Sequence, residues 1–270
     1  HRYLHSFPTR RSSDLNSVEI INFSQQNKIP IFIGNPRSGK LKDFIKNFSC
    51  TILLSINYLF LIEEDVISKF KYPINFHGSL LPKYRGRTPH VWAIINNEIE
   101  TGITAHFIDN GCDTGDVILQ EKIPLSNKDT GFSILEKFTQ VYPILVKKII
   151  NLYRSDKILG KKQQHEKATF YGKRTPDDGL IYWNWQKERI NNWVRALSFP
   201  YPGAFTFYKD EKIIIDKISY STVGFNNSIP NGTILLVEPK PVIKTSNGAI
   251  VLEIIRNNNK IEFVENKILT

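Results

Sequence analysis

The sequence NFHGSLLPKYRGR at residues 75–87 follows an apolar segment that is typical of a β-strand. Alternate residues of a strand point the same way, so Asn75 and His77 are expected to project from one face at the strand's C-terminal end. In open α/β sheets that end is where ligands bind. An amide that stabilises an oxyanion, next to an imidazole that carries a proton, is suited to acyl transfer. A turn-capping Asn and a structural His are the alternative interpretation of this pair.

The composition is that of an ordinary soluble globular protein. The chain has 270 residues, of which 41% are hydrophobic and 23% are charged. We expect no membrane partner, because no apolar run reaches the roughly 18 residues that a membrane span needs. The two cysteines, Cys50 and Cys112, provide neither a disulfide framework nor a metal-binding spacing, which favours a reducing cytoplasm.

The net charge of +10 suits either nucleic acid or an anionic substrate, although codon bias in an AT-rich genome would also enrich Lys. Residues 206–270 contain seven Lys and one Arg against seven Asp and Glu. The C-terminal part is therefore nearly neutral, and we expect no nucleic-acid partner.

Strands that alternate with helices predict an α/β fold, Rossmann-like, with a mostly parallel sheet. The predicted strands are residues 29–33, 51–55, 72–76, 101–109 and 117–123. The predicted helices are residues 17–27, 41–47, 63–69, 88–96 and 133–153. After a short helix at 188–196, short strands with glycine turns predict a small β module. These strands are expected at residues 213–215, 232–237, 242–245 and 249–255.

Three segments follow from this pattern. Residues 1–15 (HRYLHSFPTRRSSDL) have no useful periodicity and are interpreted as a leader that does not look native. Residues 16–173 are expected to form the catalytic domain. Residues 174–270 are expected to form a linker helix and an OB-like β domain.

Two further motifs invite a chemical interpretation. Residues 34–41 (GNPRSGKL) match a phosphate-binding loop except at the last position, where Leu41 lacks the hydroxyl that binds Mg²⁺. A P-loop nucleotide hydrolase is therefore a disfavoured alternative. Residues 109–116 (DNGCDTGD) lack the spacing of a calcium loop and suit a turn. Within this turn Asp113 is the best partner for His77, because Gly111 and Gly115 allow the backbone to bend around it.

Taken together, residues 75–96 and 100–116 resemble the two signature blocks of the 10-formyltetrahydrofolate-dependent formyltransferases. Residues 86–92 (GRTPHVW) and 174–179 (RTPDDG) are similar to the nucleotide-sugar branch of that family. The resemblance implies transfer of a formyl group from 10-formyltetrahydrofolate to the amino group of a nucleotide-diphosphate amino sugar, without a metal. Within the family the alternative is methionyl-tRNA formyltransferase, and outside it the alternative is a non-catalytic binding protein. The protein could also form a homodimer.

The resemblance also implies site residues. Asn75, His77 and Asp113 form the catalytic set, in which Asp113 orients His77 and raises its pKa above the ordinary value. The folate-binding residues are an apolar wall, a loop whose backbone contacts the pterin, and a cation. They are Leu59, Phe60 and Leu61, then Asp109, Asn110, Gly111 and Cys112, and finally Arg87.

The family begins with a strand, a helix and a second strand before the helix at residue 17. We expect those elements to be missing here. The strands at 29–33 and 51–55 would then lie apart or pair wrongly, because the missing strands belong between them. We expect the chain as given to be insoluble or inactive, and a restored strand–helix–strand to recover folding and activity.

The charge balance yields a first prediction. Binding to nucleic acid neutralises several phosphates and depends strongly on salt. We expect no measurable binding to transfer RNA at physiological salt, and clear binding to a nucleoside diphosphate, when both are titrated against the protein. Tight and salt-sensitive binding of transfer RNA would favour the transfer-RNA branch instead.

Overall fold

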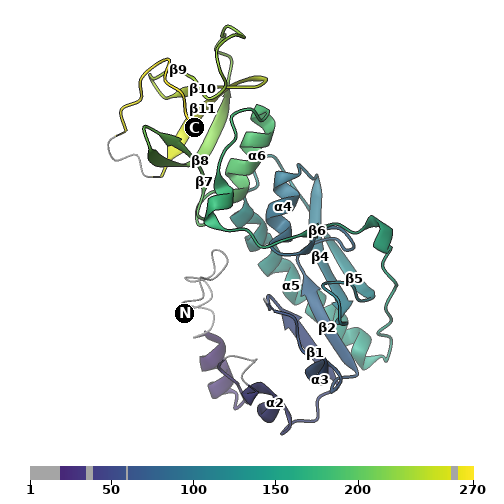
Figure 1. Cartoon of the computed structure of the whole chain (residues 1–270). Coiled ribbons are helices and arrows are strands. Elements are labelled where there is room, and N and C mark those ends of the chain that lie inside the picture. Colours follow the sequence, from purple (N-terminus) through teal and green to yellow (C-terminus); the bar gives the residue numbers. More distant parts are fainter. Residues whose placement is uncertain (1–18, 35–38, 59, 257–260) are drawn as a thin grey trace.

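The computed structural model describes residues 19–34, 39–58, 60–256 and 261–270. An α/β part and a smaller β part lie at opposite ends of the molecule, with α6 between them (Figure 1). The first part contains a helix at residues 19–26, α2 (Lys40–Ile45), β1 (Ile52–Ile56), α3 (Glu64–Ile67), β2 (Tyr72–His77), β3 (Arg85–Gly86), α4 (Pro89–Ile95), β4 (Glu100–Phe107), β5 (Val117–Pro124) and α5 (Gly131–Arg154). The predicted leader at residues 1–15 lies outside the described residues.

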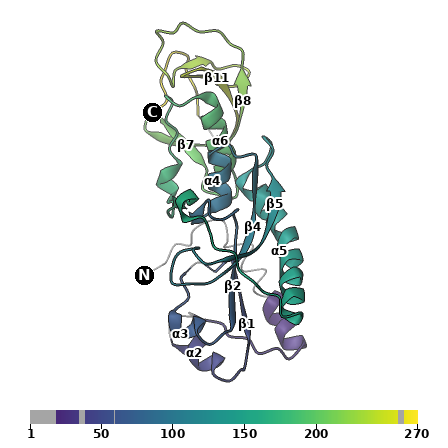
Figure 2. The same cartoon turned by 90° about the vertical axis from the view of Figure 1, so that its right-hand side faces the viewer.

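The main sheet has the strand order β1-β2-β4-β5. Strands β1 and β2 are parallel, whereas β2–β4 and β4–β5 are antiparallel. The α/β class is confirmed, but the described sheet is mixed rather than mostly parallel. The reason is the loop at residues 108–116, which is too short for a crossover and therefore reverses the chain between β4 and β5. Helix α5 runs along one side of this sheet (Figure 2).

The predicted strand at residues 29–33 is wrong. These residues form no strand, and the Ile33 side chain is 67% exposed. An apolar run becomes a strand only where a neighbouring strand pairs with its backbone. Among the described residues, β1 is the edge strand of the sheet and pairs with β2 alone. No described strand pairs with residues 29–33.

The predicted C-terminal β module is confirmed as an antiparallel sheet of order β7-β8-β11-β10-β9. Its elements, with those that lead to it, are η2 (His165–Lys167), β6 (Phe170–Tyr171), η3 (Pro176–Gly179), α6 (Lys187–Leu197), β7 (Ala204–Tyr208), β8 (Glu211–Ser221), β9 (Ile234–Leu236), β10 (Val242–Thr245) and β11 (Gly248–Ile255). Strand β7 was not predicted from the sequence. The domain boundary at 173/174 stays a prediction.

The two parts are joined through helices. Helix α6 packs on α4 and α5 of the first part and on β8 of the second. Arg195 of α6 donates to the backbone carbonyls of Ser126 and Asp129, at 3.2 and 2.7 Å. His90 of α4 is buried and lies 2.8 Å from the Tyr201 hydroxyl, just before β7. Among the described residues, no helix is both long and apolar enough to cross a membrane.

The packing of α5 on α6 yields a second prediction. A Cβ added at Gly131 would collide with the backbone carbonyl of Ala196 and lie 2.8 Å from the Tyr201 ring. We expect Gly131→Ala to destabilise the protein by about 1–3 kcal/mol, the usual cost of overpacking. Denaturant unfolding measures this change.

Gly224→Ala is the matched control, because a Cβ there meets nothing within 4 Å. An unfolding midpoint that is the same for both variants would contradict the tight packing of the two helices.

Candidate active site

The register of the main sheet brings a second histidine beside Asn75. Strand β2 pairs with β4 so that Asn75 lies opposite His106, and Asn75 Nδ2 is 3.2 Å from His106 Nε2. His106 Nδ1 faces the Phe107 carbonyl at 2.7 Å and therefore donates to it. In the neutral ring Nε2 is then an acceptor, so it receives one N–H of Asn75. The other N–H of this amide is left to donate to a reacting oxygen.

His77 is buried and has a defined tautomer. Its Nε2 lies 2.7 Å from the backbone carbonyl of Tyr84 and must carry a proton, because a carbonyl only accepts. In the neutral ring the lone pair is therefore on Nδ1. This atom faces the Asp113 carboxylate, with Oδ2 at 3.5 Å. Nδ1 can accept a proton from a reactant, and the carboxylate would stabilise the resulting imidazolium.

The carbonyl that fixes His77 comes from a left-handed turn. Tyr84 has φ 61°, a conformation that non-glycine residues rarely adopt and that costs about 1–3 kcal/mol. Three groups hold the turn in place. The Tyr84 N–H donates to Thr169 Oγ1 at 2.8 Å, its hydroxyl donates to Glu98 Oε1 at 2.7 Å, and its ring stacks on Tyr171.

Asp113 is brought to the histidines by the loop between β4 and β5. Its own φ is 56°, also left-handed. The carboxylate accepts the Gly86 N–H at 2.9 Å and lies 3.6 Å from His106 Nε2, so it is placed between the two imidazoles. A side chain at Gly115 would collide with the Phe107 carbonyl, so only glycine lets the loop return this closely to β4.

Burial decides the pKa of His77. Desolvation lowers it and outweighs the nearby Asp113 carboxylate, which raises it. The prediction that Asp113 holds the pKa above its ordinary value is therefore wrong in its net direction, although the effect of Asp113 itself has the predicted sign. For Asp113, burial raises the pKa, but His106, His77 and the Gly86 N–H together keep it well below its usual range. A neutral imidazole beside an ionised carboxylate is the arrangement of a general base.

Two of the predicted folate residues are chain neighbours of residues in the cluster, since Arg87 follows Gly86 and Cys112 precedes Asp113. Leu59 is outside the described residues, and Phe60 and Leu61 are exposed, so these two do not form a closed wall. The Arg87 guanidinium lies 6.0 Å from the centre of the Phe60 ring. Cys112 is exposed, with its thiol 3.5 Å from Asp113 Oδ2. Their role in binding folate stays a prediction.

The predicted pterin loop is held by its first residue. Asp109 accepts the Gly111 N–H at 3.1 Å and the Thr114 hydroxyl at 2.6 Å, while Asn110 is exposed. The bonds of Asp109 fix the turn that leads to Asp113. Within the described part of the chain, no group of three or more His, Cys, Asp and Glu residues is placed to hold a metal ion.

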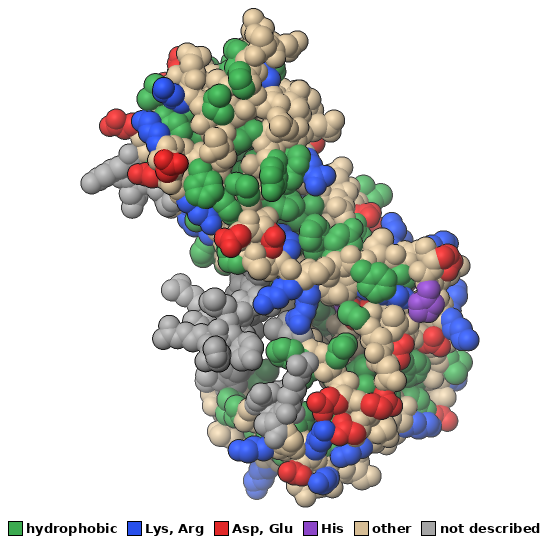
Figure 3. Space-filling model, viewed as in Figure 1, with side chains coloured by type: hydrophobic (Ala, Val, Ile, Leu, Met, Phe, Trp, Pro, Cys, Tyr) green, Lys and Arg blue, Asp and Glu red, His purple; other side chains and the backbone are tan. Residues whose placement is uncertain are grey.

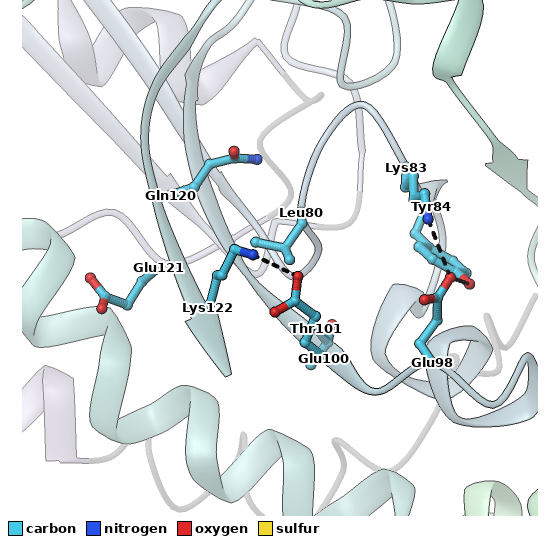
Figure 4. A pocket seen from close by; sticks show the side chains of 9 residues that line it. All are labelled: Leu80, Lys83, Tyr84, Glu98, Glu100, Thr101, Gln120, Glu121 and Lys122. Carbon is cyan, nitrogen blue, oxygen red and sulfur yellow. Dashed lines mark hydrogen bonds and ion pairs between the residues drawn. The ribbon is translucent and has the colours of Figure 1, made fainter. Parts of the chain in front are cut away.

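A hollow of about 610 Å³ lies near the site but is not lined by the catalytic set (Figure 4). Its charged side chains are paired: Lys122 with Glu100 at 2.7 Å, Lys83 with Glu98 at 3.6 Å, and Glu121 with Lys148 of α5 at 2.6 Å. Tyr84 contributes to both places, since its ring lines the hollow and its carbonyl contacts His77. The candidate site is therefore the histidine cluster and not this hollow.

With this fold and this cluster, the chain belongs to the formyl transferase family. The family model described as "Formyl transferase" matches residues 25–149, and that of the family's C-terminal domain matches residues 173–266. The first match includes residues 34–41, so the loop that resembles a phosphate-binding loop is part of a formyl transferase domain. Four residues of that loop, 35–38, lie outside the described residues.

Known proteins that are similar to the chain include one curated relative and two solved structures. The bifunctional polymyxin resistance protein ArnA of Wigglesworthia glossinidia brevipalpis is 36% identical over 218 residues, which are 80% of this chain and 33% of that protein. The chain thus spans about a third of the length of this relative. The N-formyltransferase from Helicobacter canadensis, solved with folinic acid and dTDP-3-aminofucose, has a TM-score of 0.64 at 24% identity, covering 86% of this chain and 81% of that one. Methionyl-tRNA formyltransferase from Clostridium thermocellum has a TM-score of 0.57 at 23% identity, covering 75% and 88%.

The structure adds His106 to the three residues expected from the sequence. One signal was available, since His106 lies near the end of a predicted strand, residues 101–109, whose alternate residues point one way. The sequence could not show that β4 lies beside β2 in the register that sets His106 against Asn75.

The balance of burial and charge at His77 yields a third prediction. If neutral His77 is the base, the acidic limb of the pH–rate profile should fall below pH 6.5, the ordinary pKa of histidine. Asp113→Asn removes the charge that raises this pKa, so the limb should move to still lower pH while the maximal rate falls. Measuring kcat against pH for both proteins tests this. A limb that stays in place would mean that Asp113 does not interact electrostatically with His77.

Proposed function

We propose that the protein transfers a formyl group from 10-formyltetrahydrofolate to the amino group of a nucleotide-linked amino sugar. The observation that carries the proposal is the cluster of buried His77 with partly buried Asn75 and Asp113, in which an amide N–H, an unprotonated imidazole nitrogen and a carboxylate converge. Membership in the formyl transferase family supplies the reaction class.

The chemistry of the cluster fits this reaction. Attack of an amine on a formyl carbon develops negative charge on the formyl oxygen and positive charge on the amine. The free N–H of Asn75 donates to that oxygen. His77 takes the amine proton at Nδ1, and Asp113 stabilises the imidazolium at 3.5 Å. His77 then returns this proton from Nδ1 to the folate nitrogen as the bond between that nitrogen and the formyl carbon breaks. The Tyr84 carbonyl keeps the other ring nitrogen protonated throughout, so the proton always enters and leaves at the same atom.

The folate supplies the formyl group when it is bound. Phe60 and Arg87, whose ring centre and guanidinium lie 6.0 Å apart, would hold it through a flat apolar face and a cation. The loop at residues 109–113 would supply backbone donors and acceptors to the pterin. The donor set therefore fits a flat heteroaromatic ring with an anionic tail.

A nucleotide sugar is preferred over transfer RNA as the acceptor for two reasons. The C-terminal residues 206–270 are nearly neutral. On the face shown in Figure 3, acidic and basic side chains are interspersed and do not gather into one basic area of the kind that binds nucleic acid. The solved structures from Helicobacter canadensis and Clostridium thermocellum have comparable folds, but their names give different acceptors. The fold alone therefore does not identify the acceptor of this chain.

The test is a transfer assay, which yields a fourth prediction. The chain is incubated with 10-formyltetrahydrofolate and a panel of nucleotide-linked 3-amino and 4-amino sugars, and the gain of one formyl group is followed by mass spectrometry. The chain is tested alone and with a family-like strand–helix–strand added before its N-terminus. His77→Ala should reduce turnover by roughly 10²–10⁴-fold, the usual contribution of a positioned acid–base group.

Folate binding by His77→Ala, measured by fluorescence titration, should stay unchanged, which separates lost chemistry from a lost fold. If the protein formylates methionyl-tRNA and none of the amino sugars, it belongs to the transfer-RNA branch and the proposed acceptor is wrong. Near-normal turnover by His77→Ala would remove His77 from the mechanism, and folate binding without any transfer would favour a binding protein.

A further inference from the structure

A glutamine far along the chain holds the loop that carries Asp113. The Gln163 side chain is 7% exposed, and its whole amide is hydrogen-bonded. Its Nε2 donates to the backbone carbonyls of Asp113 and Gly115, at 3.0 and 2.6 Å. Its Oε1 accepts from Arg85 Nη2 at 2.6 Å. The Gln163 side chain therefore connects the backbone at Asp113 and Gly115 to Arg85 of β3.

The orientation of this amide is set by Arg85. A guanidinium has only donors, so the oxygen of Gln163 must face it and the NH₂ group must face the two carbonyls. Arg85 is itself 2% exposed and is held by the His165 ring at 3.2 Å and by the Phe170 ring at 5.3 Å. Both of these partners come from the segment that follows Gln163.

Gln163 and β3 fix Asp113 from two sides. Gln163 holds the backbone on which Asp113 has its left-handed conformation. Gly86, next to Arg85, holds the carboxylate through its N–H. Without Gln163 the left-handed turn loses the bonds that oppose its relaxation, and the carboxylate would leave its place between His77 and His106.

We propose that Gln163 is a positioning residue for the transfer reaction, which acts by fixing Asp113 beside His77. This inference rests on the proposed function, and in particular on the role of Asp113. It assigns a part in the chemistry to a segment that lies between the residues matched by the two family models.

Gln163→Glu is the principal variant. It keeps the shape of the side chain and a partner for Arg85, but replaces the donor NH₂ with an oxygen that faces two carbonyls. We expect kcat to fall by about 10²-fold, the effect of a displacement near 1 Å at a reacting group. The KM for the amino sugar should change little, since Gln163 contacts Asp113 and not the acceptor. Gln163→Leu, which also removes the partner of Arg85, should lower both kcat and the Tm.

Gln164→Leu is the matched control, because this neighbouring side chain is exposed. It should leave kcat and the Tm unchanged. All variants are made in the form of the chain that carries transfer activity, and single-turnover rates are measured for the slow ones.

Combination with Asp113→Asn separates positioning from a general structural effect. If Gln163 acts through Asp113, adding Gln163→Glu to Asp113→Asn should cause no further loss of rate. Losses that multiply in the double variant, or normal turnover by Gln163→Glu alone, would overturn the inference and leave the proposed function intact. Normal turnover by Asp113→Asn would instead overturn the proposed site, and the inference with it.

Discussion

The hydrogen bond from His77 Nε2 to the Tyr84 carbonyl is the interaction on which the rest of the site depends. It decides which ring nitrogen is free, and so where a proton can enter. A histidine with two exposed nitrogens would exchange between tautomers, and its basic nitrogen would not be fixed at one position. Here the left-handed turn at Tyr84 aims one carbonyl at one nitrogen, and the cost of that conformation is offset by the contacts of its ring, hydroxyl and N–H.

A second constraint is the burial of one carboxylate with two imidazoles. Burying a charge is unfavourable unless it is paired and hydrogen-bonded. Asp113 meets this condition through the Gly86 N–H, and the two imidazoles beside it pair with it when they carry a second proton, so its pKa is held below its usual range. For His77 the effect of burial prevails, because desolvation lowers its pKa and so favours the neutral ring. The same buried cluster thus maintains an ionised carboxylate and an unprotonated base, which is the pair that acid–base chemistry needs.

The site also depends on a segment that belongs to neither sheet. Strand β6 pairs with β3, and the residues around it supply Thr169 to the Tyr84 turn and Gln163 to the Asp113 turn. Both left-handed turns are therefore supported by residues 163–171. These contacts make the geometry of the candidate site sensitive to how this segment packs.

The sequence by itself determined the α/β class, the separate β module and the face from which Asn75 and His77 project, because periodicity and turn residues are local properties. It also indicated Asp113 through the two glycines of its loop. It failed at residues 29–33, where apolar composition predicted a strand but no described strand offers a partner. Only the tertiary structure decided the mixed pairing of the sheet, the place of His106, the free nitrogen of His77 and the sign of its pKa shift. Each of these depends on register, on burial or on a contact between residues distant in the chain, such as Gln163 and Asp113. Local sequence therefore determines none of them.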